Sequence, residues 1–169
     1  MTFELEVNFA ATTQLIDILA VVNTEYVKKM YPNPSRDWKN PTRINNSAIY
    51  LLNSTGDSNL RVNVGDVVAF RGTSISDNVT DVVDVYNLRH FSGATVFGPF
   101  AVQITSVNAV PEDPEAPSGL LLSAQAEAVR SFGAKAISMG TESVGTSFAL
   151  YSAQHLYGYF WWNWVATAI

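Results

Sequence analysis

Short runs of β-branched, aliphatic and aromatic residues recur along the whole 169-residue chain, and residues that favour turns separate them. Runs of this length are typical of strands, because a helix needs a longer segment to bury one apolar face. Eight or nine such runs favour two packed sheets over alternating strand–helix units. The sequence therefore predicts an all-β fold: an antiparallel β-sandwich, jelly-roll-like, with at most one short helix, in a single domain over residues 1–169.

The predicted strands are all rich in apolar residues and bounded by polar or glycine-containing segments. They cover Leu15–Thr24, Asn46–Asn53, Leu60–Val64, Val67–Ser74, Val79–Leu88, Thr95–Val107, Ala134–Met139, Val144–Tyr151 and Leu156–Trp162. Gly65-Asp66 is a hairpin signal, so the runs before and after it are expected to pair with each other. Gly98-Pro99 predicts a kink, because proline lacks a ladder donor. The final segment, WWNWVATAI, is expected to be a strand docked in a sheet.

Two segments leave helix and strand open. Residues 24–29 (TEYVKK) either continue the first strand or form a helical turn, and Leu120–Phe132 combines good helix formers with an alternating pattern. The proline-rich residues 30–42 (MYPNPSRDWKNPT) are predicted to form an ordered loop, which Tyr31 and Trp38 hold against the body of the protein. Residues 111–119 (PEDPEAPSG) are expected to form a surface loop.

Charge limits the classes of partner. Charged residues make up only 15% of the chain, and the net charge is −5. Nucleic acids and anionic membrane surfaces require clustered Lys and Arg, so neither is expected as a partner. Low charge also weakens repulsion between copies and favours a homo-oligomer. Glu4 and Glu6 stand where a secretory signal would be basic, and no apolar run is long enough to span a bilayer, so a cytoplasmic location is expected.

Catalytic and cofactor-binding signals are few. His90 and His155 are the only histidines, and GTSFA at residues 145–149 lacks the final glycine of a nucleophile elbow. The chain has no cysteine and no glycine-rich nucleotide-binding motif. We therefore predict no catalytic residues and no bound cofactor. Calcium is the one candidate metal, because residues 57–59 (DSN) and 77–78 (DN) place carboxylate and amide oxygens in predicted loops, although these are also ordinary turn residues.

The C-terminal segment is unusually aromatic, and it supplies the candidate ligand or interface residues. Alternation along a strand would place Tyr157, Tyr159 and Trp161 on one face and Phe160 and Trp162 on the other. One face should belong to the core. The other is expected to form a subunit interface or a platform on which a sugar stacks, since Trp and Tyr are enriched at interfaces. The candidate residues are Tyr157, Tyr159, Trp161, Trp162 and Trp164.

Three segments carry a family resemblance: IDILAVVNTEYVKKMYPNPSRDWKNPT near the start, LRVNVGDVVAFRGTS in the middle and LYGYFWWNWVATAI at the end. In this order they resemble the PixA/AidA family of bacterial inclusion-body proteins. The resemblance implies a small cytoplasmic protein, in some members accumulated as inclusions and produced under quorum-sensing control. It implies no enzymatic activity and no active-site residues. With 3 Met, the chain lacks the methionine richness of the member that named the family.

Three functions are consistent with these features. The first is a non-enzymatic protein that self-associates, at least as a dimer. The second is a carbohydrate-binding, lectin-like β-sandwich, with or without a dependence on calcium. The third is a hydrolase whose catalytic residues are dispersed along the chain. Low charge, the aromatic terminus and the family resemblance favour the first.

Overall fold

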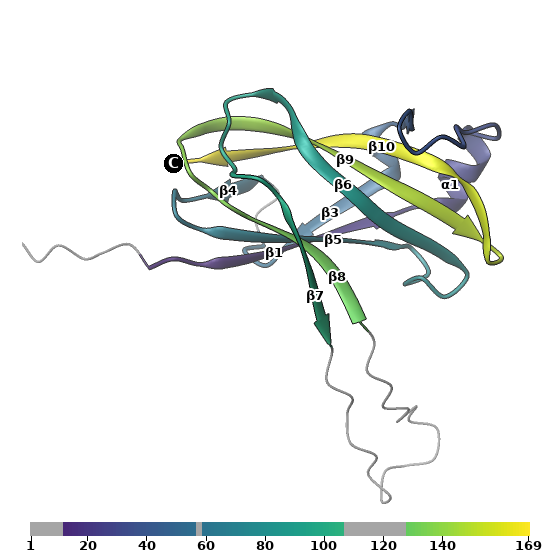
Figure 1. Cartoon of the computed structure of the whole chain (residues 1–169), viewed down its shortest axis with the longest axis horizontal. Coiled ribbons are helices and arrows are strands. Elements are labelled where there is room, and N and C mark those ends of the chain that lie inside the picture. The colour runs from purple at the N-terminus through teal and green to yellow at the C-terminus, as the bar shows by residue number, and fades with distance from the viewer. Residues whose placement is uncertain (1–11, 57–58, 107–127) are drawn as a thin grey trace, which may run out of the picture.

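The computed structural model describes residues 12–56, 59–106 and 128–169, with the side chains of residues 105, 106, 128 and 129 left aside. One short α-helix, one 3-10 turn and ten strands make up the described part (Figure 1). They are β1 (Leu15–Val22), α1 (Thr24–Met30), β2 (Thr42–Arg43), η1 (Asn46–Ala48), β3 (Ile49–Asn53), β4 (Leu60–Val62), β5 (Val67–Ser74), β6 (Asp81–Gly93), β7 (Ala101–Ser106), β8 (Ala128–Lys135), β9 (Gly140–Ser152) and β10 (His155–Ala168). No helix in these ranges has the length and hydropathy to cross a bilayer.

The strands form two sheets, so the predicted all-β sandwich is confirmed. One sheet has the order β3-β1-β5-β8-β7, and the other has β2-β10-β9-β6, with β4 also paired to β10. Both sheets are mixed, because β5 runs parallel to β1, and β2 and β4 run parallel to β10. Parallel partners require a crossover connection. The segment between β1 and β5, which contains α1, β3 and β4, forms this crossover connection.

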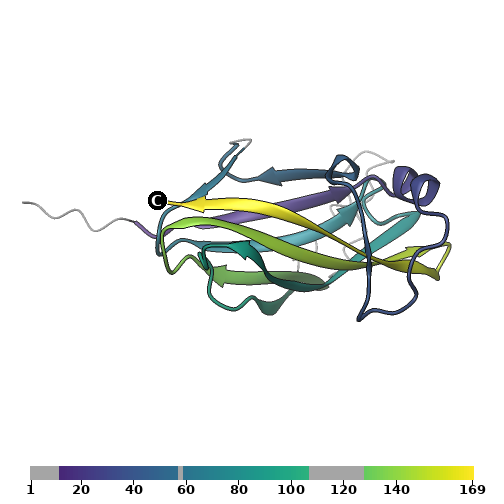
Figure 2. The same cartoon turned by 90° about the horizontal axis from the view of Figure 1, so that it is seen from above.

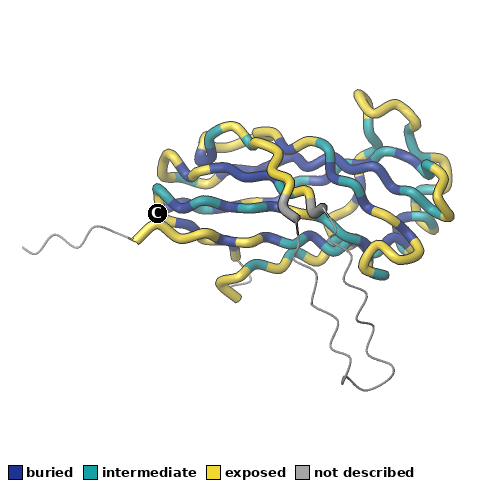
Figure 3. Tube along the Cα trace, turned by 60° about the horizontal axis from the view of Figure 1, so that its bottom comes forward, coloured by how far each residue is buried: buried dark blue, intermediate teal, exposed yellow. Residues whose placement is uncertain are grey.

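The core lies between the sheets, where alternate residues of each strand point inward. Strand β1 contributes Ile16, Ile18, Ala20 and Val22, all buried. Phe70 of β5, in the same sheet as β1, stacks on Trp164 of the facing sheet with centroids 5.3 Å apart, and within that facing sheet Phe148 stacks on Phe160 with centroids 5.6 Å apart. Figure 3 shows the buried positions running along the strands and the exposed ones gathered at turns and edges.

The hairpin predicted at Gly65-Asp66 is wrong. The turn exists, and Gly65 has φ of +101°, but it connects the two sheets: β4 pairs with β10, whereas β5 pairs with β1 and β8. The buried Asp66 carboxylate accepts hydrogen bonds from the backbone N–H groups of Asn63 (2.8 Å) and Gln14 (3.0 Å). These bonds stabilise a chain that passes from one sheet to the other, which a turn motif alone does not reveal.

The structure resolves one of the two ambiguous segments and part of the other. Residues 24–30 form helix α1, whose N-terminus is capped by the Asn23 side chain accepting from the Tyr26 N–H. The described end of the 120–132 segment lies in strand β8, whereas residues 107–127, including the 111–119 loop, lie outside the described residues. The strand predicted from Thr95 begins at Ala101, after an isolated bridge between Phe97 and Ala136.

The proline-rich loop packs differently from the prediction. Tyr31 is half-buried and meets Phe160 edge-on at 6.2 Å, as expected. Trp38, however, is 57% exposed. The loop is held instead by the carbonyl of Ser35, which accepts from the Tyr159 N–H, and by Pro34, which lies where a Cβ on Gly158 would be. Because these contacts attach the loop to β10, the Trp38 ring is left free to face solvent.

Helix α1 is tied to the second sheet by the buried carboxylate of Asp81. It accepts hydrogen bonds from the Thr24 hydroxyl at 2.7 Å and the Ser152 hydroxyl at 2.9 Å, and it lies 2.9 Å from the Lys28 ammonium. Burial acts to raise the pKa of Asp81, but these hydrogen bonds and the Lys28 charge outweigh it and hold that pKa below its ordinary value. The carboxylate therefore stays charged and joins α1, β6 and β9.

We expect Asp81→Asn to lower the free energy of unfolding at neutral pH by about 2 kcal/mol, because a neutral amide leaves Lys28 with only the exposed Glu25 as its ionic partner and cannot accept every donor. The control is Asp84→Asn on the same strand. Asp84 pairs with Arg130 at 3.2 Å with both side chains well exposed, so its loss should cost less than about 1 kcal/mol. Urea unfolding measures both, and equal losses would contradict the assignment.

The lowered pKa of Asp81 also predicts how the free energy of unfolding depends on pH. A carboxyl whose pKa is lower in the folded state stabilises the fold above its unfolded pKa of about 4, and this contribution disappears as the pH falls through the folded pKa. The unfolding free energies of the wild type and Asp81→Asn should therefore converge below about pH 4. A difference that stays constant from neutral pH into acid would show that the lowered pKa of Asp81 is not involved.

Candidate functional site

Two of the five aromatic candidates belong to the core. Trp162 and Trp164 are 2% and 4% exposed, and both point between the sheets from β10. The Trp164 indole N–H donates to the Thr146 hydroxyl at 2.8 Å, so its one polar group is already paired inside the protein. Neither ring can reach a ligand or a second copy at the surface, because the facing sheet covers both.

Tyr157 does not share a face with Tyr159 and Trp161, contrary to the prediction. The register of β9 and β10 shifts between Leu156 and Gly158, and Tyr157 is the extra residue in this bulge. Its ring stacks on Phe160 at 6.3 Å, and its hydroxyl lies 3.1 Å from the Lys28 carbonyl and 2.9 Å from that of Tyr31. Tyr157 therefore anchors the end of α1.

Tyr159 and Trp161 lie half-buried on the outer face of the sheet, turned away from the core. Each meets an aromatic ring from β6: Tyr159 contacts Tyr86 edge-on at 5.8 Å, and Trp161 contacts Phe91 at 5.3 Å. We call this surface the aromatic face and define it by Tyr86, Phe91, Tyr159 and Trp161. It contains the two sequence candidates that remain at the surface.

Sequence reasoning missed Tyr86 and Phe91, because β-bulges place them on the aromatic face. The register of β6 against β9 shifts between Val85 and Asn87 and again between His90 and Ser92. The two aromatic residues are the extra residues at these shifts, and each bulge changes the direction of a side chain. A simple alternation would have placed neither position reliably, and the predicted strand ended at Leu88, before Phe91.

Strand β9 lies between β10 and β6, the two strands that carry the rings of the aromatic face. Its outward residues Ser143, Gly145, Ser147 and Ala149 are small, and all are buried, although they point away from the core. Neighbours cover them: a Cβ on Gly145 would lie 3.7 Å from Arg89 and from Phe91. Small residues in the middle strand and large ones on both sides produce a channel along the outer face.

The proline-rich loop closes one end of this channel and creates a groove. Figure 2 shows the loop running from α1 across the line of β9 and β10 and back. The groove, of about 380 Å³, is lined by Trp38, Lys39, Pro41, Tyr86, Asn87, Arg89 and Ser147. The Tyr86 hydroxyl donates to the Trp38 carbonyl at 2.7 Å. Burial raises the pKa of Tyr86, against a hydrogen bond with Ser147 that lowers it, so the phenol keeps the proton that it donates.

Cationic side chains lie over several of the aromatic rings on this side of the protein. The Arg43 guanidinium lies over Trp161 at 4.9 Å and over Phe91 at 5.6 Å, and the Lys39 ammonium lies 5.5 Å from the centre of the Trp38 ring. Arg89 and Lys39 line the groove, and none of its lining residues is Asp or Glu. In a chain of net charge −5, this places a local excess of positive charge on the aromatic face.

The opposite side of the sandwich has an apolar surface of its own. On β1 and β3, Leu19 is the register partner of Leu52, and Val21 is the partner of Tyr50. Partners in register point to the same side of a sheet, and here that side is the outer one, because the alternate residues of β1 fill the core. Tyr50 and Leu52 are 54% and 56% exposed. We call these four residues the β1–β3 face.

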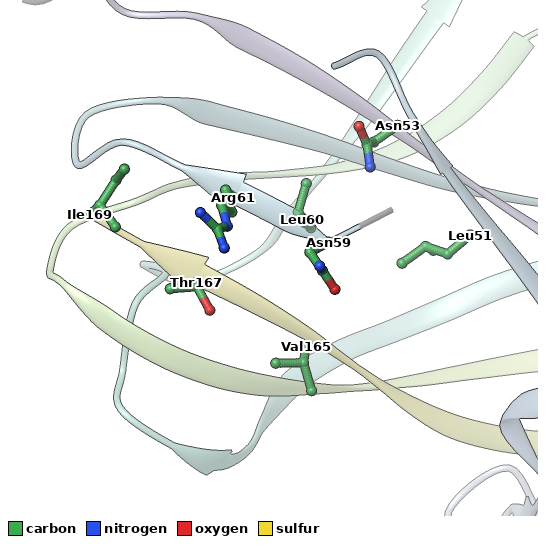
Figure 4. A pocket seen from close by; sticks show the side chains of 8 residues that line it. All are labelled: Leu51, Asn53, Asn59, Leu60, Arg61, Val165, Thr167 and Ile169. Carbon is green, nitrogen blue, oxygen red and sulfur yellow. The ribbon is translucent and has the colours of Figure 1, made fainter. Parts of the chain in front are cut away.

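A further hollow, of about 430 Å³, opens between β3 and the paired strands β4 and β10 (Figure 4). Its apolar lining consists of Leu51, Leu60, Val165 and Ile169, and Arg61 is the only charged side chain among its described lining residues. Residues 57–58, which adjoin Asn59 in the chain, lie outside the described residues. We therefore assign no ligand to this hollow.

The titratable groups considered for catalysis have structural partners. His90 Nδ1 lies 2.8 Å from the buried carboxylate of Glu142, which also accepts from the N–H groups of Val96 and Phe97. His155 is exposed at the start of β10. Within the described residues, no serine hydroxyl is hydrogen-bonded to either histidine, so no Ser-His pair is assembled there.

The loops considered for calcium are only partly described. The Asn78 side-chain carbonyl accepts from the N–H groups of Ser74 and Val83, so it stabilises the turn before β6. No group of three or more His, Asp or Glu residues suited to a metal occurs in the described ranges. Asp57 and Ser58 lie outside them, and calcium binding stays a prediction.

Comparison with known proteins gives one consistent answer. The family model PixA, described as inclusion body protein, matches residues 14–167. The crystal structure of the inclusion body protein PixA from Burkholderia cenocepacia J2315 superposes with a TM-score of 0.86 and is 37% identical, and the alignment covers 96% of this chain and 100% of that one. No curated protein matches the chain. The resemblance of the three sequence segments is therefore confirmed.

The hydroxyl of Tyr86 is expected to hold the loop that carries Trp38. In Tyr86→Phe the ring contact with Tyr159 remains, but the 2.7 Å bond to the Trp38 carbonyl is lost. Amide exchange in residues 36–40 should accelerate by about fivefold, the equivalent of one net hydrogen bond of about 1 kcal/mol. Tyr159→Phe is the matched control, because no described residue is hydrogen-bonded to the Tyr159 hydroxyl. Identical exchange in both variants would contradict this role.

Proposed function

This chain belongs to the PixA family of inclusion body proteins, and we propose that it is a non-enzymatic protein whose copies associate through the outer faces of its two sheets. The observation that carries the proposal is the β1–β3 face. Soluble monomers rarely leave large apolar side chains exposed side by side. Tyr50 and Leu52 are exposed in this way on β3, and their register partners Val21 and Leu19 on β1 lie half-buried beside them, so the four form one apolar group in two directly opposed pairs.

The occupant proposed for this face is a second copy of the chain. The four side chains carry no charge, so two copies related by a twofold axis bring no like charges together at the centre of the contact. Arg71 and Thr73, the parallel partners of Leu19 and Val21 on β5, border the apolar group with polar atoms. An apolar centre with a polar border is the usual composition of a protein interface.

Growth into an inclusion needs more than one contact surface for each copy. One self-complementary face gives a closed dimer, whereas two different faces allow an open assembly. The aromatic face lies on the other side of the sandwich, and there Phe91 is 42% exposed beside Trp161. This supports a second contact at the Phe91–Trp161 end of the aromatic face, in line with the role expected for the C-terminal strand.

Absence of catalysis is part of the proposal. It is supported by the pairing of His90 with Glu142 and of Asp81 with Lys28, which engages these groups in holding the fold together. Production under quorum-sensing control, which the family resemblance implies, is also part of it. Transcript levels that do not differ between low and high cell density would contradict that regulation.

Carbohydrate binding, the alternative function, requires a groove with a ring to stack on and polar groups beside it. The groove beneath Trp38 meets this requirement. It lies on a different surface from the β1–β3 face, so the two activities do not exclude each other.

The test of self-association is sedimentation velocity over a range of protein concentrations. The wild type should form species larger than the monomer as concentration rises. The double variant Tyr50→Glu/Leu52→Glu should weaken association by about 100-fold or more, because burying two large apolar side chains is worth about 3 kcal/mol. Phe91→Glu should limit growth to the dimer.

The matched control is Met139→Glu, which places the same charge at a side chain that is also exposed, 70%, but lies on neither face. It should associate like the wild type, and circular dichroism should show that all variants keep their fold. A wild type that stays monomeric at every concentration would refute self-association. A double variant that associates as well as Met139→Glu would refute the β1–β3 face.

A further inference from the structure

The groove beneath Trp38 is lined by the kinds of side chain that bind small ligands, namely aromatic rings and hydrogen-bonding groups. Trp38 supplies a flat aromatic surface that is more than half exposed, and Tyr86 is the second aromatic residue that lines the groove. The amide of Asn87 and the hydroxyl of Ser147 also line it, and both can donate and accept hydrogen bonds. A volume of about 380 Å³ lies within the range of small-molecule sites, at its smaller end.

The charged side chains that line the groove determine whether it favours an anionic or a cationic ligand. Lys39 and Arg89 line it, and neither takes part in the four ion pairs of the described residues. The nearest acid in the loop, Asp37, is already engaged by the Lys39 N–H and the Asn40 side chain. A groove with two cationic lining residues, no lining carboxylate and only the single negative charge of Asp37 nearby carries net positive charge and favours an anion, and Arg binds carboxylates with paired hydrogen bonds.

We propose that this groove binds a saccharide that carries a carboxylate, with its ring stacked on Trp38 and its carboxylate paired with Arg89 and Lys39. A pyranose presents C–H groups on one face, which pack on an indole, and hydroxyls at its edge, which Asn87 and Ser147 can bind. The site is preorganised, because the Tyr86 hydroxyl fixes the backbone that carries Trp38. This inference is independent of self-association.

The groove requires a ligand with both an anionic group and a ring that stacks on Trp38. Each requirement disfavours one class of ligand. A neutral sugar stacks on Trp38 but gives Arg89 and Lys39 no carboxylate to pair with. A nucleotide supplies a charge, but its ribose separates the phosphate from the base that would stack, whereas the Lys39 ammonium lies only 5.5 Å from the centre of the Trp38 ring. The uronic acids, sugars with a ring carboxylate, satisfy both requirements.

The experiment is calorimetric titration of the full chain with trigalacturonic acid, with maltotriose as the neutral trisaccharide and adenosine monophosphate as the nucleotide. Trigalacturonic acid should bind at least about tenfold more tightly than either, since a hydrogen-bonded charge pair is worth about 1.5 kcal/mol or more. Its affinity should fall as salt is raised. Trp38→Ala should abolish binding of trigalacturonic acid, and Arg89→Gln should reduce its affinity to that of maltotriose.

The controls separate this site from the association surfaces. Trp38 and Arg89 are both exposed, so the two variants should fold, which thermal unfolding checks. Arg71→Gln on the opposite sheet removes the same charge and should bind like the wild type, as should Tyr50→Glu/Leu52→Glu. The proposal is overturned if trigalacturonic acid does not bind, if maltotriose or the nucleotide binds as tightly, or if Trp38→Ala and Arg89→Gln bind like Arg71→Gln.

Discussion

Strand β10 lies between β9 on one edge and β2 and β4 on the other, and its inward rings fill the space between the sheets. Phe160, Trp162 and Trp164 meet Phe148 and Phe70 within 5.3–6.2 Å. Large rings bury more area per residue than aliphatic side chains. This packing fixes the register of β10, and the register decides which of its residues reach the surface.

The surface that remains depends on three bulges, two in β6 and one in β10. Bulges in β6 turn Tyr86 and Phe91 outward, and the bulge in β10 turns Tyr157 inward against Phe160. Small residues on β9 then leave a channel between the rings. Such a channel would be filled if the outward positions of β9 carried large side chains, so side-chain size on one strand determines the shape of the whole aromatic face.

The two sides of the sandwich differ in chemistry, and this separates the dimer contact from the saccharide groove. The β1–β3 face is flat and uncharged at its centre, a composition suited to a second copy of the chain. The aromatic face combines rings with Arg43, Arg89 and Lys39, and the proline-rich loop hollows one end of it. In a chain of net charge −5, a cationic groove attracts other, acidic copies of the chain and so lowers solubility. The same positive charge suits an acidic ligand.

By itself, the sequence determined the β-rich class, most strand positions, the family and the aromatic strand at the C-terminus, because period and composition act locally along the chain. Only the tertiary structure decided that β4 and β5 belong to different sheets, that Trp38 stays exposed, and that Trp162 and Trp164 are core while Tyr159 and Trp161 are surface. The partner of a strand and the position of a bulge depend on residues far away in sequence: Leu60 pairs with Ala166, and Tyr86 meets Tyr159. No local pattern contains those contacts, so the groove could not be predicted from the residues that line it.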